Sequence, residues 1–541
     1  MKAAGLAVLL AAVAVAFADS SIVVLALPGL LSSFDVSIDL VAWVVTAYNL
    51  VLALGALAFV RVGRRIDPAR LALAGAGGFL GASVACALAP EIWFLIAFRA
   101  VQGLGATLLL LGALPLVRGL ARTPGRGSAL WTGAGVFGAA LGPALGGMLT
   151  DAFSWRAIFY AQAPVAALAV VAAAIVRVPA EEPAETPPRE GPGRWAASFA
   201  LALASAALVG LLFLAVIELI DVWRLSPLAA GAAVTTIPLA TLAAVPLAAR
   251  IGPPAAATGA ILLAAGLAGM AFVPERALAW VVAALAIAGL GYGLLVPAVA
   301  RGALAGGSPV ASGALSVSLR HLGLVAGLLV LTPLLAADLT SAGNTAELRG
   351  ISVVLDAPVP AKSKLRLAID LAPVLATPAQ KGLPDFRRVL AHEHDLSAVG
   401  LGSQLDSTVQ ATIGRSFRRS FAVAALFALL AGIPVALAAR RPLRAFVVAA
   451  AAAVALIGAE LGDGALAYGA RPTLLPPCAH RTQVVGQSTD QRLVLRGLDL
   501  LACRLHETRE KLVVHAAEDG VDAASLAGRV ERLAKVFSHL P

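Results

Sequence analysis

Long apolar stretches separated by short polar segments occupy most of the first 440 residues of the chain. Each stretch can form an apolar helix of about 20 residues, the length that crosses the hydrocarbon core of a bilayer. The pattern predicts an all-α polytopic membrane protein with twelve spans, at 4–31, 40–60, 70–89, 92–117, 128–149, 156–177, 195–220, 227–249, 255–273, 277–300, 310–336 and 416–439. A thirteenth apolar run follows at 443–461.

The first apolar run could be either a cleaved signal peptide or a membrane span. Its start, from Met1-Lys2 to Ala16-Phe17-Ala18, has the form of a secretory signal that ends in an Ala-x-Ala cleavage site. The apolar pattern nevertheless continues to Leu31, with Asp19 as an interruption. This continuation favours an uncleaved first span that carries an acid.

The spans fall into two groups of six, on either side of a segment rich in proline and glutamate. We therefore expect an N-terminal bundle at 1–178, an exposed linker at 179–194 and a C-terminal bundle at 195–440. Short motifs recur in both groups in the same order, at offsets of 181 to 189 residues: Arg61-Val-Gly63 with Arg250-Ile-Gly252, Gly-Leu-Gly105 with Gly-Leu-Gly291, and Gly142 and Gly146 with Gly323 and Gly327. Such parallel repeats predict two bundles with pseudo-two-fold symmetry, which rock about a site near the membrane midplane.

The distribution of arginine predicts which way the spans face. If the N-terminus is cytoplasmic, fifteen arginines fall in short cytoplasmic connections and three, Arg156, Arg224 and Arg276, in short outer ones. Basic residues gather on the cytoplasmic side of membrane proteins, so this orientation in the cell membrane is favoured. The same bias accounts for the net charge of +10 without a nucleic-acid partner. Residues 338–415 and 464–541 would then be extracytoplasmic, with an extra span at 441–463 before the tail.

The two long polar regions carry little chemistry. In the tail, apolar positions at helical spacing predict two amphipathic helices, at about 488–517 and 521–539, which could bind an extracytoplasmic partner. Cys478 and Cys503 also lie there, and an oxidising location would allow them to form a disulfide. His392-Glu-His-Asp395 does not by itself supply the tetrahedral geometry of a zinc site. The sequence contains no catalytic triad, phosphate-binding loop or nucleotide fingerprint, so we expect no enzyme activity, no cofactor and no metal.

Three motifs resemble those of the major facilitator superfamily and, within it, of the drug:proton antiporter branch that includes 14-span exporters. They are Asp19-Ser-Ser-Ile-Val-Val-Leu-Ala-Leu-Pro28 in span one, Arg99-Ala-Val-Gln-Gly-Leu-Gly105 in span four, and Gly138-x-x-x-Gly142-Pro143-x-x-Gly146-Gly147 in span five. The resemblance covers about residues 10–440 and implies two six-helix bundles and proton-coupled export. The region 195–225 holds one span, so the two extra central helices of the 14-span relatives are missing.

Asp19 and Arg99 are predicted to lie at comparable depths within the bilayer. Ionisable groups there are costly and usually functional, and an embedded guanidinium needs a counter-charge, for which Asp19 is the obvious candidate. The resemblance implies that Asp19, Arg99 and Gln102 take part in proton relay or in its linkage to substrate. Two structural roles remain open: an aspartate satisfied by neighbouring hydroxyls, and an arginine that caps carbonyls of the first span.

The glycines of span five predict close helix packing. Small residues four apart let two backbones approach, and Pro143 removes a backbone hydrogen bond and bends the helix. We expect Gly138, Gly142, Gly146 and Gly147 to form a tight contact between the two bundles that resists leakage while the bundles rock. Packing of small residues without a transport role is the alternative.

The loop after span two carries a weaker signal. Its residues Arg61, Gly63, Arg64 and Arg65 resemble a family signature that is damaged here, because Ala56 and Val60 replace its glycine and its aspartate. The loop could latch the two halves, with Asp67 as a substitute acid, or could only anchor the topology.

Four residues in spans two and eleven could line a cavity. Trp43 and Tyr48 fit an aromatic pattern of the branch, and Arg320 and His321 resemble its span-eleven motif. Packing and anchoring at the membrane interface are the more frequent roles of such side chains.

Three functions are open on the sequence. The first is proton-driven export of small hydrophobic organic compounds, which a bundle built mostly from Ala, Leu, Val and Gly favours over sugars. The second is export of a lipid or a cell-envelope precursor, which the outer loop and the tail would receive. The third is a non-transporting receptor or scaffold, suggested by the damaged loop. We take the first as the working prediction, with the bilayer, a hydrophobic solute and protons as partners.

Overall fold

The computed structural model divides the described part of the chain into two compact units. It describes residues 2–62, 66–176, 192–251, 254–273, 277–303, 309–357, 361–376, 397–438, 474–478, 489–521, 525, 526, 528 and 532. These residues form helices and turns, and no strand occurs among them. The first unit, here called the transmembrane unit, comprises 1–335 and 418–462, and the second, here called the loop–tail unit, comprises 336–417 and 463–541.

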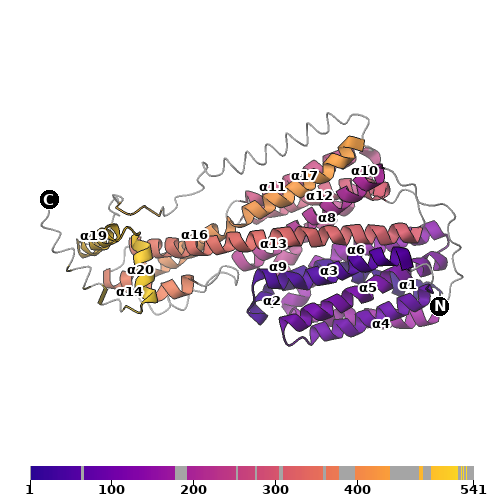
Figure 1. Ribbon diagram of the computed structural model, residues 1–541, viewed down its shortest axis with the longest axis horizontal. Helices are drawn as coiled ribbons and strands as arrows, with labels where there is room; N and C mark the ends of the chain where they lie inside the picture. The colour runs from indigo at the N-terminus through magenta and orange to yellow at the C-terminus, as the bar shows by residue number, and fades with distance from the viewer. Residues whose placement is uncertain are drawn as a thin grey trace. The chain divides into compact units, whose positions relative to one another are not determined.

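The first half of the transmembrane unit contains six long apolar segments. They are α1 (Lys2–Ile22) with the 3-10 turn η1 (Val23–Ala26) and α2 (Leu27–Phe34), α3 (Ile38–Val62), α4 (Pro68–Ala87), α5 (Ile92–Leu120), α6 (Pro124–Ala152) and α7 (Arg156–Ile175). α5 packs against α3 and α4, as Figure 1 shows in indigo and purple, and α1 packs against α6. Two helices begin with a cap and a proline in the first turn: Asp67 accepts from the Ala69 N–H at 2.8 Å, and Thr123 from the Arg126 N–H at 3.3 Å.

The second half also contains six apolar segments, and one of them is interrupted between α9 and α10. Its segments are α8 (Pro192–Ile217) with the π turn η3 (Glu218–Val222), α9 (Pro227–Val234) followed by α10 (Thr236–Ile251), α11 (Ala255–Ala271), α12 (Leu278–Ala303), α13 (Pro309–Asp356) and α17 (Phe417–Ala438). α12 packs against α8, α10 and α11. α13 has 48 residues, which is more than twice the length needed for one crossing, and its last part belongs to the loop–tail unit.

The described helices confirm the predicted all-helical membrane fold. Eleven of them are long and apolar enough to cross a membrane, and the remaining predicted span, 255–273, is the apolar but shorter helix α11. The thirteenth run at 443–461, most of the linker at 179–194, and the loop residues Gly63, Arg64 and Arg65 lie outside the described residues. Arg61 is described only as part of the backbone of α3, and Asp67 acts as the cap of α4.

Close glycine contacts relate the two halves to each other. Gly138 of α6 lies directly against the Ala14 carbonyl of α1, and Gly323 of α13 lies in the same way against the Ala202 carbonyl of α8. The sequence match of Gly142 and Gly146 with Gly323 and Gly327 was therefore one helical turn out of register. The structure pairs Gly138 with Gly323 and Gly142 with Gly327, because each pair faces the same element of its own half.

The loop–tail unit is a small helical assembly that the sequence predicted only in part. Beyond α13 it contains α14 (Ala361–Leu375), α16 (Ser397–Gly414), α19 (Thr489–Arg504) and α20 (Arg509–Glu518), and α14 packs against α20 (Figure 1). The predicted helix at 488–517 is broken, because the chain turns between α19 and α20 with His506 at a positive φ of 56°. Most of the second predicted tail helix, at 521–539, lies outside the described residues.

An ion pair joins the two segments of the loop–tail unit, and further contacts stabilise each segment by itself. The buried Arg509 donates to Asp356 at the end of α13 at 2.5 Å and to the neighbouring Glu510 at 2.9 Å. Lys364 is also buried and donates to the Leu355 carbonyl at 2.8 Å. Cys478 and Cys503 are linked by a disulfide, with their Cα atoms 4.6 Å apart. The tail therefore folds together with the region between α13 and α17.

Candidate functional site

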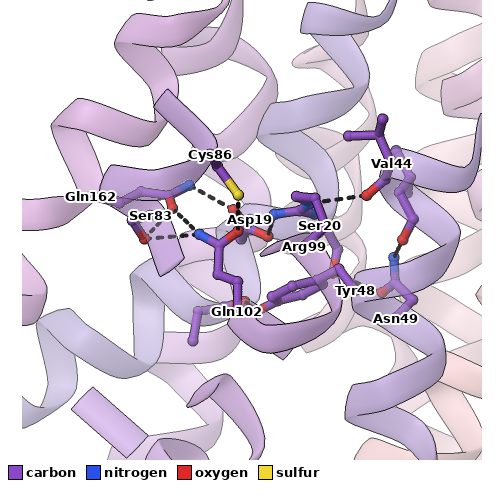
Figure 2. A network of polar contacts seen from close by, with 12 residues as sticks. Asp19, Ser20, Val44, Tyr48, Asn49, Ser83, Cys86, Arg99, Gln102 and Gln162 are labelled. Atoms are coloured by element: carbon purple, nitrogen blue, oxygen red, sulfur yellow. Dashed lines mark hydrogen bonds and ion pairs between the residues drawn. The ribbon is translucent and has the colours of Figure 1, made fainter. Parts of the chain in front are cut away.

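Asp19 of α1 and Arg99 of α5 form an ion pair within the first half. Arg99 Nη1 donates to Asp19 Oδ2, and neither side chain has any accessible surface. Figure 2 shows the two side chains pointing toward each other between their helices. A charge removed from water in this way costs several kcal/mol unless an opposite charge and hydrogen bonds compensate it. The pair expected from the sequence is thus formed.

Neutral groups also hold the guanidinium of Arg99. Its Nε donates to the Val44 carbonyl of α3 at 2.9 Å, and Nη1 also donates to Gln102 Oε1 at 2.7 Å. The ring of Tyr48 lies under the guanidinium, with 4.4 Å between Cζ and the ring centroid. Among the described residues, Nη2 has no hydrogen-bond partner. Arg99 therefore has several contacts that do not depend on the charge of Asp19.

A set of buried amides completes the network. Gln162 of α7 donates from Nε2 to the second oxygen of Asp19, Oδ1, at 2.6 Å. Gln102 Nε2 lies 2.8 Å from Gln162 Oε1 and 2.9 Å from Ser83 Oγ of α4. The network in Figure 2 thus draws on five helices, α1, α3, α4, α5 and α7, and Asp19 is its acid. Each carboxylate oxygen of Asp19 accepts a hydrogen bond, one from Arg99 of α5 and the other from Gln162 of α7. A change in the charge of Asp19 therefore alters its contacts with both helices.

The glycines after Arg99 explain how these helices come close enough. A Cβ on Gly103 would lie 2.5 Å from the Tyr48 carbonyl of α3, and one on Gly105 would lie 2.5 Å from the Phe79 nitrogen of α4. Only glycine permits such an approach of backbones. The run from Arg99 to Gly105 therefore combines two polar side chains with the contacts that bring their partners into reach.

The second half has no equivalent ion pair at the corresponding positions. Asp19 follows Ala14 by five residues, and Ala207 follows its counterpart Ala202 by the same interval. Arg99 precedes Gly103 by four residues, as Leu285 precedes Gly289, which packs against α10 as Gly103 packs against α3. Ala207 and Leu285 are both fully buried. The same helix packing thus forms around two apolar side chains.

The glycine motif of α6 packs mainly inside the first half. Gly138, Gly142 and Gly146 lie against backbone or Ser21 atoms of α1, and Ser21 Oγ also donates to the Ala139 carbonyl at 3.1 Å. This corrects the expectation of a contact between the two bundles for these three glycines. The spacing of small residues predicts a close neighbour, but not which helix it is.

Gly147 is the motif residue that does meet the other half. Its Cα hydrogen faces the Pro227 carbonyl at the start of α9, and a Cβ there would lie 3.1 Å from Gly231 Cα. A Cβ on Gly231 would in turn lie 2.9 Å from the carbonyl of Pro143. Backbone meets backbone at this contact between α6 and α9.

The other candidate residues lie in different surroundings. Tyr48 is buried and donates to the Ala16 carbonyl at 2.7 Å, so it belongs to the network, whereas Trp43 is 41% exposed. Arg320 and His321 of α13 face Phe17 of α1 rather than Asp19. Gln162 and Ser83 were not among the candidate residues that the sequence indicated. The signal that could have found them is a polar side chain inside an otherwise apolar span.

Comparison with known proteins places this chain in one family. Residues 9–337, more than half of the chain, match the model described as Major Facilitator Superfamily. A segment of 155 residues is 37% identical to a multidrug resistance protein, Stp, of Mycobacterium tuberculosis, and covers 28% of this chain and 29% of that protein. A segment of 163 residues is 34% identical to the multidrug efflux pump LfrA of Mycolicibacterium smegmatis and covers 30% of this chain and 32% of the pump. The chain thus matches less than a third of the length of either relative.

A solved structure shares the fold at low sequence identity. The crystal structure of a bacterial homologue of the human lysosomal transporter Spinster, inward-facing and unoccupied, superposes with a TM-score of 0.56 and 17% identity. The match covers 82% of this chain and 98% of that one. With the family model matched over more than half of the sequence and this fold in agreement, the protein belongs to the Major Facilitator Superfamily, a family of membrane transporters and not of enzymes.

Proposed function

We propose that this protein exports small hydrophobic organic compounds in exchange for protons, and that Asp19 is the group that binds the proton. The observation that carries the proposal is the buried Asp19–Arg99 pair, whose positions in the other half are occupied by Ala207 and Leu285. The second half forms the same helix packing without such a pair, and ionisable groups buried in membrane spans are usually functional.

The contacts of Arg99 suit a site where an acid gains and loses a proton. When Asp19 is protonated, the ion pair is lost, but Arg99 keeps the Val44 carbonyl, Gln102 Oε1 and the Tyr48 ring as partners. Gln162 can turn its amide so that its oxygen accepts the new O–H of Asp19. Protonation therefore weakens the attachment of α1 to α5 without leaving the guanidinium unsolvated.

The position of Asp19 on α1 offers a route from protonation to movement of the two halves. Phe17, two residues before Asp19, lies 6.2 Å from the His321 ring of α13, measured between centroids. α1 also carries the carbonyls against which the glycines of α6 pack. A shift of α1 is thus passed to helices that form the interface between the halves.

The composition of the chain and the names of its relatives support a hydrophobic cargo. The chain is 60% hydrophobic and 13% charged, so the helices offer few polar groups of the kind that a sugar requires. The names of two relatives, a multidrug resistance protein and a multidrug efflux pump, agree with export of such compounds. Family membership favours a transporter over a non-transporting receptor.

The loop–tail unit supports thirteen spans with an extracytoplasmic tail. Its two segments pack together through α14 and α20, which favours a location on one side of the membrane. α17 leaves that side, so the chain must cross once more before the tail. The run at 441–463 is apolar enough for this crossing. With a cytoplasmic N-terminus, the unit is extracytoplasmic.

Transport in proteoliposomes tests the proposed function. Purified protein is reconstituted, a pH gradient is imposed, and movement of hydrophobic fluorescent compounds with positive, negative or no charge is followed. We expect the gradient to drive at least one compound against its concentration, and a protonophore to abolish this. Movement of every compound at a rate indifferent to the gradient would rule out proton coupling.

A further inference from the structure

Arg320 of α13 is a cation with no acidic partner among the described residues. Its guanidinium carbon lies 5.6 Å from the centroid of the Phe17 ring, and its Nε is buried without a hydrogen-bond partner there. Arg99, by contrast, is paired with Asp19. An aromatic face compensates a cation only in part. A charge in a membrane-spanning helix that lacks its counter-ion is expensive, and such residues commonly mark a substrate pathway.

Aromatic groups from both halves meet at the phenylalanine that Arg320 faces. Trp131 of α6 packs edge-on against Phe17 of α1, with 5.5 Å between ring centroids, and the His321 ring lies 6.2 Å from the same phenylalanine. Trp131 is 7% exposed, and its Nε1, a donor, has no partner among the described residues. We call these residues, Phe17, Trp131, Arg320 and His321, the Phe17 cluster. It combines flat apolar surfaces with two donors that have no acceptor.

We propose that the Phe17 cluster binds substrates through an anionic group, so that the preferred cargo is a hydrophobic organic anion with a flat body. Arg320 supplies the counter-charge, Trp131 Nε1 supplies a second donor, and the aromatic rings contact the apolar body. Both donors are satisfied by carboxylate or sulfonate oxygens, whereas a cationic or neutral compound leaves the charge of Arg320 uncompensated. This inference rests on the proposed function for its role in transport, and it adds the charge class of the cargo.

Binding of three probes that differ in charge tests the proposal without any transport step. The full-length protein in detergent is mixed with 2-naphthoate, 2-naphthamide or 2-naphthylmethylammonium, and the thermal unfolding midpoint is measured against probe concentration. A ligand that binds the folded state raises the midpoint. We expect the half-saturating concentration of naphthoate to be at least about tenfold lower than that of the other two, since a hydrogen bond to a charged group is commonly worth this factor or more.

Substitutions assign the preference to Arg320. In Arg320→Gln the three probes become equivalent, and in Arg320→Lys the preference for naphthoate persists in weakened form. Arg156→Gln is the matched control, because Arg156 also stacks on an aromatic ring, Trp155 at 4.2 Å, but belongs to the start of α7. It should keep the wild-type ranking.

Each result decides for or against the proposal. A wild-type protein that binds the three probes equally, or that prefers the cation, overturns it even if Arg320→Gln fails to fold. Retention of the naphthoate preference in a folded Arg320→Gln variant also overturns it and points to another cation. If the protein prefers naphthoate but shows no gradient-driven transport, the proposed function is wrong and the proposed binding site is still supported.

Discussion

Asp19 of α1 and Ala207 of α8 occupy equivalent positions in the two halves, and both are fully buried. One fold thus tolerates either a charged or an apolar side chain at the same place. The apolar choice avoids the cost of removing a charge from water. Under the proposed function, the aspartate and its partner Arg99 supply the proton-binding group, and this group lies in the first half only.

We expect Gly138→Ala to destabilise the transmembrane unit. The new methyl group would collide with the Ala14 carbonyl, and overpacking of this kind typically costs about 1–3 kcal/mol. Gly133→Ala on the same helix is the matched control, since nothing lies within 4 Å of its Cβ position. Alanine there should leave the unfolding midpoint unchanged or raise it. Thermal unfolding in detergent measures both, and equal midpoints would contradict the packing described for α1 and α6.

Gly147→Ala should act on leakage more than on stability. Its methyl group would meet the Pro227 carbonyl of α9, at a contact between the halves and not inside one of them. The halves would then close less completely on this side. We predict a faster passive proton leak in proteoliposomes without substrate, measured with a pH-sensitive dye inside the vesicles. Gly138→Ala serves as the comparison, and a leak that rises equally in both variants would argue against a special role of Gly147.

The disulfide reports the side of the membrane that the tail reaches. In intact cells, an impermeant maleimide should label no cysteine before reduction and both Cys478 and Cys503 after it, because Cys86 is buried. Labelling of the pair only after the cells are opened would reject the extracytoplasmic tail and the thirteenth span. Reduction should also destabilise the loop–tail unit by about 3.5 kcal/mol, from the entropy of a loop closed over 25 residues.

Stability of the loop–tail unit should rise with pH between about 8 and 10.5. Burial lowers the pKa of Lys364 from 10.5 to about 8; the Asp356 carboxylate opposes this shift and Arg509 reinforces it. In that window the unfolded chain binds more protons at this residue than the folded one, so the free energy of unfolding increases as protons are removed. Below pH 8 the folded unit holds a buried ammonium, and this gain is absent.

Pulse proteolysis in urea, with the fragment that contains residues 336–417 as the readout, measures this slope. The comparison is with Lys364→Met, which has no group to titrate, and Lys364→Arg, which stays charged throughout the window. Both variants should lose the part of the slope that Lys364 contributes. The same slope in all three proteins would show that other groups cause it.

The sequence predicted the spans and the ion pair for simple physical reasons. Apolar runs indicate which segments cross the bilayer, so the positions of the helices were nearly correct. They do not indicate where a helix ends, and α13 continues beyond its apolar run to Asp356 through polar residues. Asp19 and Arg99 could be paired because few ionisable groups lie deep in the spans. Gln162 and Ser83 were not predicted as site residues, because an uncharged polar side chain can find a backbone partner in almost any helix and so need not indicate a site.

The partners of the glycine motif could not be predicted at all. The spacing predicts that Gly138 and Gly142 lie on one face of a helix, but it does not predict whether α1 or α9 covers that face. The register of the repeat had the same weakness, because glycine and alanine are frequent in every span. Only the contacts with Ala14 and Ala202 fixed which glycines correspond.

Substrate-driven proton flux in proteoliposomes, compared between the wild type and Asp19→Asn, tests the central claim most directly. Asp39→Asn is the matched control, because Asp39 lies in the first turn of α3, with its side chain outside the Asp19 network. We predict that the wild type and Asp39→Asn move protons when substrate is added, and that Asp19→Asn, folded and still able to bind substrate, moves none. Proton flux at the wild-type rate in Asp19→Asn would contradict the account.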